Sequence, residues 1–359
     1  MKRLALLLLV ITVFFGIVLP VQAANPPPID IQIYPPDHIW NVPVDTLPVD
    51  PMSKTYINSA NSSAYLYVYR GNHYNLVDSS TPKQYMTSIK YALGSDDVPV
   101  PIPQDAMVET QSEDHGMNIL DTDSKVYYAI FDAQKAADGT WSCGSLAMFD
   151  LSSYALRPDG STADAAGLPA LPGYLRYDEV ASGEITHALR INLWQTQNAH
   201  IWPARHHSGI ANTAYSPMGQ RFRLKASVDI SGYSPQQQVI LKAMKKYGVM
   251  VTDNSGNRNI WSLSATQDSR WDINYATFDG IKGSDFEAVD VSSLMIDEDS
   301  GKARIPPIDS SNPTLIKISD PEPAGVPSYQ KNSKIPEILI PIVCISILVI
   351  CIVVGFMQK

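Results

Sequence analysis

Two long apolar segments, one at each end of the chain, leave only the residues between them to form a globular domain. Residues 1–23 begin with Lys2 and Arg3 and continue through an apolar stretch to small residues, as a signal peptide does. Residues 338–357 carry no charge, and such a run of about 20 residues is long enough for a membrane-spanning helix. We expect the first segment to be cleaved after Ala23 or Ala24, or alternatively to remain as an anchor. The second places the domain outside the cell membrane in a single-pass topology.

The remaining chain divides by composition. We predict an N-terminal extension over 24–34, an extracellular domain over 35–295, a Pro/Ser-rich spacer over 296–334, and a membrane anchor or sorting signal over 335–359. The formal charge of −9 argues against nucleic-acid binding, which needs a basic surface. Cys143 is the single cysteine outside the C-terminal segment, so a disulfide framework is excluded.

Short runs rich in aromatic and β-branched residues dominate the central domain. Most are bounded by Gly, Pro, Asn or Asp, which is typical of β-strands. The runs cover residues 64–70, 125–131, 145–151, 184–193, 221–230, 248–252 and 259–265. This pattern predicts a mainly β fold, with a single antiparallel β sandwich or jelly-roll-like domain as its architecture.

One helix has clear boundaries. Ser234 and Gln237 have the spacing of a capping box, Pro235 suits the first turn, and Gly248 ends the segment. The apolar residues between them recur on one face, so the sequence predicts a helix packed against the sheet.

Two of the predicted strands present polar residues on one face. In residues 184–193 this face includes Arg190 and Asn192, which are placed to meet a ligand or to be solvated. In residues 221–230 three cations alternate on the predicted outer face: Arg221, Arg223 and Lys225. Such a row needs acids or an anionic ligand opposite it, and a groove for an acidic polysaccharide is one interpretation.

The loops of the middle third hold the candidate catalytic groups. Asp164, Asp178 and Glu184 could supply the carboxyl pair of a glycoside hydrolase, or Arg176 could simply neutralise nearby acids. In a polysaccharide lyase, Arg205 or Arg223 would neutralise the substrate carboxylate, while a base removes the adjacent proton. The candidates for that base are His206, His207 and Tyr177. No HExxH or CxxC spacing occurs, so we expect neither a metal site nor a cofactor.

Two resemblances to known proteins add to this interpretation. The segment 163–190 (ADAAGLPALPGYLRYDEVASGEITHALR), with the later segments 223–232 and 246–254, resembles a family of exported proteins from bacteria, fungi and archaea that has no established activity. It implies one extracellular domain over about residues 37–290 and supplies no catalytic residue. Pro336 and Glu337 before the apolar segment resemble archaeal PEF-type sorting signals handled by archaeosortases, although Ile338 replaces Phe, and a plain tail anchor is the alternative.

These features predict a membrane-anchored cell-surface protein whose partner is a cell-surface or environmental polysaccharide. The first hypothesis is a carbohydrate-active enzyme, either a polysaccharide lyase or a glycoside hydrolase, acting on an acidic glycan. The alternative is a non-catalytic glycan-binding or surface-architecture module. An exported redox, metal or peptide-processing role is a third.

Overall fold

A computed structural model of the chain describes residues 25–271, 278 and 280–305. The predicted signal peptide, residues 306–334 of the predicted spacer and the apolar C-terminal segment lie outside the described residues. Within the described part, every helix is too short or too polar to cross a bilayer.

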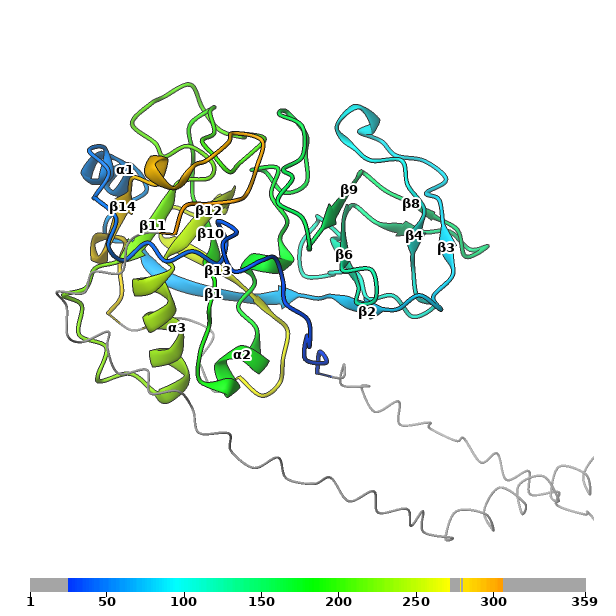
Figure 1. Cartoon of the computed structure of the whole chain (residues 1–359), viewed down its shortest axis with the longest axis horizontal. Helices are drawn as coiled ribbons and strands as arrows, with labels where there is room; N and C mark the ends of the chain where they lie inside the picture. The colour runs from blue at the N-terminus through cyan, green and yellow to red at the C-terminus, as the bar shows by residue number, and fades with distance from the viewer. Residues whose placement is uncertain (1–24, 272–277, 279, 306–359) are drawn as a thin grey trace, which may run out of the picture. The chain divides into compact units, whose positions relative to one another are not determined.

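The larger of the two main sheets has six strands. Its spatial order is β1 (Tyr65–Asn72), β13 (Ile260–Thr266), β10 (Leu189–Leu193), β12 (Val249–Asn254), β11 (Arg221–Leu224) and β14 (Phe286–Val289). The pairs β1–β13 and β10–β12 are parallel, and the other three pairs are antiparallel. Strands from the beginning and the end of the domain therefore lie side by side in one sheet (Figure 1).

The second sheet follows β1 in the chain. Its four strands are β2 (Asn75–Val77), β5 (Met117–Asp121), β6 (Val126–Phe131) and β9 (Ser145–Asp150). Two small ribbons adjoin it in sequence, formed by β3 (Lys83–Gln84) with β4 (Val100–Pro101) and by β7 (Gln134–Lys135) with β8 (Trp141–Ser142). Short 3₁₀ turns complete the fold at Ala92–Gly94, Leu171–Gly173, Gly283–Asp285 and Ser292–Leu294.

The predicted mainly β fold is confirmed, and most strand pairs in the described residues are antiparallel, but three pairs are parallel. Both sheets are mixed, because β2–β5 is parallel as well as the two pairs named above. A short apolar run identifies a buried strand but carries no information about its direction. Parallel neighbours require a long crossover, and the chain supplies one between β10 and β12 in residues 194–248, which include the main helix.

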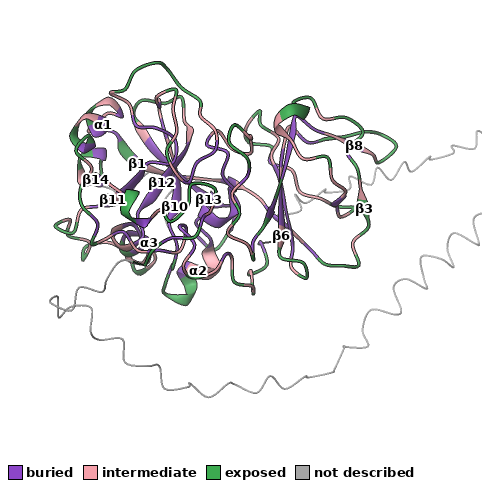
Figure 2. Ribbon diagram, turned by 45° about the horizontal axis from the view of Figure 1, so that its top comes forward, coloured by how far each residue is buried: buried purple, intermediate pink, exposed green. Residues whose placement is uncertain are grey.

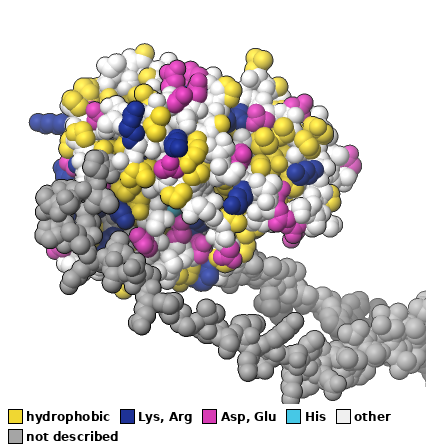
Figure 3. Space-filling model, viewed as in Figure 1, with side chains coloured by type: hydrophobic (Ala, Val, Ile, Leu, Met, Phe, Trp, Pro, Cys, Tyr) yellow, Lys and Arg dark blue, Asp and Glu magenta, His cyan; other side chains and the backbone are white. Residues whose placement is uncertain are grey.

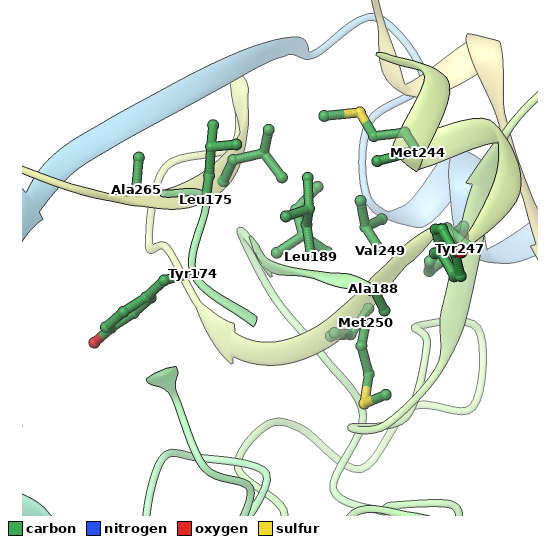
Figure 4. Close-up of a cluster of buried hydrophobic side chains, with 14 of the residues drawn as sticks. Tyr174, Leu175, Ala188, Leu189, Met244, Tyr247, Val249, Met250 and Ala265 are labelled. Atoms are coloured by element: carbon green, nitrogen blue, oxygen red, sulfur yellow. The ribbon is translucent and has the colours of Figure 1, made fainter. Parts of the chain in front are cut away.

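That helix, α3 (Pro235–Lys246), has the predicted capping box: Gln237 N–H donates to Ser234 Oγ, and Ser234 N–H donates to the Gln237 side chain. Figure 4 shows Met244 of α3 on the same side of the strands as Leu189 and Val249. Two shorter helices, α1 (Ser53–Ser59) and α2 (Tyr177–Ser182), also occur. The prediction of a helix packed on the sheet is confirmed.

The largest apolar core joins the two sheets. It contains Leu66 and Leu263 of the six-stranded sheet together with Leu120 and Tyr127 of the four-stranded sheet, all buried. Strand residues are mostly buried, whereas burial in the loops is mixed: many loop positions are exposed (Figure 2), but residues 166–176 are buried throughout. The two sheets therefore share buried surface and belong to one compact unit.

Packing extends beyond the predicted domain limits of 35 and 295 at both ends. Upstream, Ile29, Ile31 and Ile33 pack against the main core. Downstream, Ala303 is buried, and its neighbour Lys302 pairs with His38 in a β-bridge. Part of the predicted extension and the first residues of the predicted spacer therefore belong to the folded body.

Two strands are shorter than predicted. The run 184–193 forms a strand only from Leu189, and the run 221–230 only as far as Leu224. After Leu224 the chain turns, because the Val228 amide donates to the Lys225 carbonyl. Alternation of polar and apolar residues continues through such a turn, so the sequence pattern alone overestimates the strand.

Candidate functional site

A cleft of about 390 Å³ lies on the polar face of the six-stranded sheet. Its floor comes from β1, β10, β12 and β13, and its walls come from the four-stranded sheet and from loops within residues 109–116 and 163–170. The polar and aromatic side chains that line it include Tyr67, Tyr69, Glu109, Asp114, Asp164, Tyr174, Arg190, Asn192, Asp253, Asn254, Ser262 and Ser264.

Strand alternation explains why the floor is polar. On β10, Leu189 and Ile191 are fully buried, while the intervening Arg190 faces the cleft. On β13, Leu263 is fully buried between Ser262 and Ser264, which also line the cleft. Successive side chains of a strand point to opposite faces, so each strand contributes apolar residues to the core and polar ones to the cleft.

Asp164 is held in the cleft wall by its own loop. Its Oδ1 accepts hydrogen bonds from the amides of Ala166 (3.0 Å) and Leu168 (2.8 Å), and its side chain is 7% exposed. Its Oδ2 lies 3.5 Å from a guanidinium nitrogen of Arg190. Burial raises the pKa of this carboxyl to about 7, although Arg190 and the two amides oppose the shift. Near neutral pH the group can therefore both hold and release a proton.

Asp253 is the second carboxylate of the cleft. It is half-buried at the end of β12, where its Oδ1 accepts a hydrogen bond from the Asn254 amide at 2.7 Å. Burial raises its pKa, and attraction to Arg190 opposes this change. Arg190 itself is fixed by a hydrogen bond from Nε to Thr252 Oγ1 (3.1 Å) and lies over the Tyr174 ring. One arginine thus interacts with both carboxyl groups.

The loop of residues 109–116 adds two more acids at the edge of the cleft. Glu109 is buried and accepts hydrogen bonds from the Tyr69 hydroxyl and from the Ser112 amide, both at 2.9 Å. Asp114 is exposed, and its pKa is raised by partial burial and then by the nearby Glu109. The cleft therefore contains four acidic side chains and one basic side chain.

Three of the predicted site residues meet in this cleft: Asp164, Arg190 and Asn192. The residues around α2 lie elsewhere. Arg176 pairs with Glu179 and lies 3.8 Å from Asp178, and Asp178 accepts a hydrogen bond from the Ile29 amide. Tyr177 packs edge-on against Trp271. This group holds the N-terminal extension and residues 268–271 against the domain.

The remaining predicted catalytic residues are also outside the cleft. Glu184 is exposed and lies 3.9 Å from Lys246. His206 Nδ1 contacts the Ala165 carbonyl at 3.1 Å, and His207 Nδ1 lies 3.2 Å from His200 Nδ1. These positions do not bring the histidines to either cleft carboxyl.

Arg205 lines a different hollow of about 1040 Å³. Its guanidinium is occupied by Asp299 Oδ1 and by the carbonyls of Glu298 (2.9 Å) and Arg157 (2.7 Å). His206 and His207 follow Arg205 directly, and His200, which lies 3.2 Å from His207, lines the same hollow as Arg205. The Arg205 guanidinium is nevertheless occupied by protein groups, and Arg223 and Tyr177 contact other segments.

Arg221 and Arg223 of the predicted cationic row are occupied within the protein, so the row does not form an outward-facing groove. Arg221 is 1% exposed and donates to the carbonyls of Tyr247 (2.7 Å) and Ile39 (2.9 Å). Arg223 pairs with Glu287 and donates to the Val44 carbonyl, among others. Lys225 Nζ donates to the Ser284 carbonyl. Arg221 and Arg223 do share one face of β11, but residues 39–47 cover the part of that face that would otherwise meet solvent.

Sequence reasoning missed Asp253, Asn254, Glu109, Asp114 and Tyr69. A usable signal existed for two of them, because Asp253 and Asn254 directly follow the apolar run of β12. Glu109 and Asp114 lie on an irregular loop whose position depends on long-range packing.

The lysine and arginine side chains visible in Figure 3 are scattered among acidic and uncharged ones. Within the described ranges, no group of three or more His, Cys, Asp or Glu side chains has a geometry for a metal ion. Neither a protein-family model, nor a curated protein, nor a solved structure matches the chain.

Proposed function

We propose that the chain is a glycoside hydrolase whose active site is the cleft containing Asp164, Asp253 and Arg190. The observation that carries this proposal is the placement of two carboxyl groups around one arginine in a single polar cleft. Glycoside hydrolysis needs such a pair, one carboxyl as proton donor and the other as base or nucleophile.

In this mechanism Asp164 is the general acid. Its buried carboxyl donates a proton to the glycosidic oxygen as the bond from that oxygen to the anomeric carbon breaks. In one route the Asp253 carboxylate takes a proton from the water that attacks the anomeric carbon, and both carboxyls then exchange protons with solvent. In the other route Asp253 attacks the anomeric carbon to form an ester; Asp164 then takes a proton from the water that hydrolyses this ester, which restores Asp164 and frees Asp253. The stereochemistry of the product, read by NMR, distinguishes these two routes.

The rest of the cleft suits a sugar. Asn192, Asn254 and the serines Ser262 and Ser264 offer hydrogen-bonding groups for hydroxyls, and Tyr67 adds an aromatic ring. The acidic glycan expected from the sequence depended on the cationic row, which is occupied internally. A cleft with four acids and one arginine instead favours a glycan without carboxylates.

The two apolar terminal segments support a proposal for where in the cell this activity takes place. We propose that the protein is exported through residues 1–23 and held at the cell membrane by residues 335–359, either as an anchor or as a sorting signal. The domain would then act on cell-surface or environmental polysaccharide.

A non-catalytic glycan-binding module is the alternative, and one observation favours it. The two amide hydrogen bonds to Asp164 Oδ1 give this residue a structural role in its own loop. Under this alternative the cleft would bind a glycan without cleaving it.

The test is to incubate the purified domain, residues 25–305, with a panel of neutral and amino-sugar polysaccharides. The assay measures new reducing ends. We expect Asp164→Asn and Asp253→Asn each to lower turnover by about 10² to 10⁴ fold, because each removes a group that transfers a proton or forms a bond. Glu184→Gln is the matched control, since this exposed acid lies outside the cleft. Binding without new reducing ends would support the module instead.

A further inference from the structure

The cleft contains buried oxygen atoms that have no hydrogen-bond donor. They are Asp164 Oδ2, Asn192 Oδ1 and Asn254 Oδ1, and all three residues line the cleft. The orientation of Asn254 is fixed because its Nδ2 donates to the Ser208 carbonyl at 3.2 Å. Asn192 Oδ1 and Asn254 Oδ1 have no hydrogen-bond partner, and Asp164 Oδ2 has only the Arg190 guanidinium at 3.5 Å. Buried acceptors in this state are costly, so the cleft is suited to a ligand that brings donors.

The register of the sheet brings these acceptors to one region. Asn192 of β10 is the direct partner of Asp253 on β12, and Leu193 is the partner of Asn254. Asp164 reaches the same region through Arg190, from which its Oδ2 is 3.5 Å away. The register therefore places Asn192 beside Asp253, and Asn254, which follows Asp253 in the chain, lines the same cleft.

The charge of the cleft determines which donor fits best. Even with Asp164 protonated, as its role of general acid requires, Glu109, Asp114 and Asp253 outnumber the single arginine of the cleft lining, Arg190. An ammonium group brings three donors, accepts no hydrogen bond and carries a positive charge. A hydroxyl could satisfy an acceptor but would gain nothing from the negative charge.

We propose that the substrate is a glycan with free amino groups, whose ammonium is bound by Asp253 together with the unpartnered oxygens of Asn192 and Asn254. This inference rests on the proposed function, because it takes the ligand of the cleft to be a glycan. It adds the chemical class of the sugar: a deacetylated amino-sugar polymer in place of an acetylated or neutral one.

The experiment compares three β-1,4-linked tetrasaccharides by calorimetry at pH 6, built from glucosamine, N-acetylglucosamine or glucose. The protein is the catalytically impaired Asp164→Asn variant of residues 25–305, so that binding is measured without turnover. We expect the glucosamine tetramer to bind at least about tenfold more tightly than the other two. Its affinity should fall as salt is raised from about 0.05 to about 0.5 M, because added ions screen the attraction between the ammonium groups and the carboxylates of the cleft.

Three further substitutions, one of them a control, test which carboxylate binds the ammonium group of the sugar. Adding Asp253→Asn should reduce the preference for glucosamine over glucose to less than about threefold, because the charge that binds the ammonium is lost at constant shape. Adding Asp114→Asn, at an exposed position, should lower the preference less, and adding Glu184→Gln should not change it.

Equal or tighter binding of the N-acetylated or glucose tetramer would overturn the amino-sugar inference and leave the proposed hydrolase in place. An unchanged preference in the Asp253→Asn background would overturn the assignment of Asp253. Failure of all three tetramers, and of the polysaccharide panel, to bind would overturn both the inference and the proposed function.

Discussion

At the scale of single residues, Asp164 is governed by two opposing influences. Burial favours its neutral form, while Arg190 and the amides of Ala166 and Leu168 favour the carboxylate. Burial is the larger influence and places the pKa at about 7. A carboxyl in this state can donate a proton at neutral pH, as a general acid must.

This environment predicts a pH dependence of stability. The folded protein holds the Asp164 proton up to about pH 7, whereas an unfolded aspartate releases it near pH 4. In this window the folded state binds more protons, so the contribution of Asp164 to the free energy of unfolding decreases as pH rises. Asp164→Asn keeps the shape and the Oδ1 acceptor but cannot titrate. We expect the stability of the wild type relative to this variant to fall by a few kcal/mol, on the order of 1.4 per pH unit, between pH 4 and 7.

Urea unfolding of the two proteins at several pH values measures this difference. Glu184→Gln serves as the control, because Glu184 is exposed and should produce no comparable trend. Parallel stability curves for the wild type and Asp164→Asn would mean that the Asp164 carboxyl is ionised throughout.

Part of the candidate site could be inferred from residues alone. The sequence indicated Asp164 because it lies in a loop rich in Gly and Pro, where polar side chains are usually near the surface. It indicated Arg190 and Asn192 because strand alternation places them on the polar face. The contrast with Arg221 shows the limit. Alternation gives the face of a strand, but whether solvent or another segment covers that face depends on residues 39–47, which are distant in sequence.

At the scale of elements, buried Arg221 connects three segments. Its two hydrogen bonds join β11 to the end of α3 at Tyr247 and to the turn at Ile39. We expect Arg221→Met to lower the free energy of unfolding by about 2 to 4 kcal/mol, because two buried carbonyls lose their donors. Lys225→Met, at the last position of the predicted row and with its amine exposed, should change it by less than about 0.5 kcal/mol.

Denaturant unfolding measures both effects, and glycan binding by the folded variants is the second readout. Loss of binding by a stably folded Arg221→Met protein would restore the interpretation of the cationic row as a ligand groove.

The cap of α3 gives a second prediction for an element. Ser234 Oγ accepts from the Gln237 amide, and the helix buries Ile240, Leu241 and Met244 against the core. Removing a serine cap typically costs about 1 kcal/mol, so Ser234→Ala should lower the stability of the whole domain by this amount. Ser234→Asp, which can still cap, should retain most of it, and equal losses in thermal or urea unfolding would exclude the cap as the cause.

This helix was predictable because its signals are local: the capping residues, the proline and the apolar spacing lie within one short segment. Strand pairing is not local. β1 pairs with β13 although nearly the whole domain separates them in sequence, and neither run specifies its partner. The main helix and seven of the strands could therefore be identified from the sequence, whereas β2, β5 and β14, the mixed sheets and the cleft between them could not.

At the scale of the whole molecule, the cleft links the two sheets. Asn118 of β5 and Phe131 of β6 line it together with Arg190 and Ser262 of the six-stranded sheet. The largest core also draws on both sheets, so neither can unfold without exposing buried apolar surface of the other. A ligand in the cleft binds only the state in which both sheets are in place.

Ligand binding should consequently stabilise both sheets together. A ligand at about 100 times its dissociation constant adds about 2.7 kcal/mol to the free energy of unfolding, if it binds the folded state alone. For the glucosamine tetramer bound to Asp164→Asn, we expect amide hydrogen exchange through global opening to slow by about 100-fold in β5 and β6 as well as in β10 and β13. Slower exchange in only one sheet would mean that the sheets open independently, and that the ligand contacts one wall of the cleft without the other.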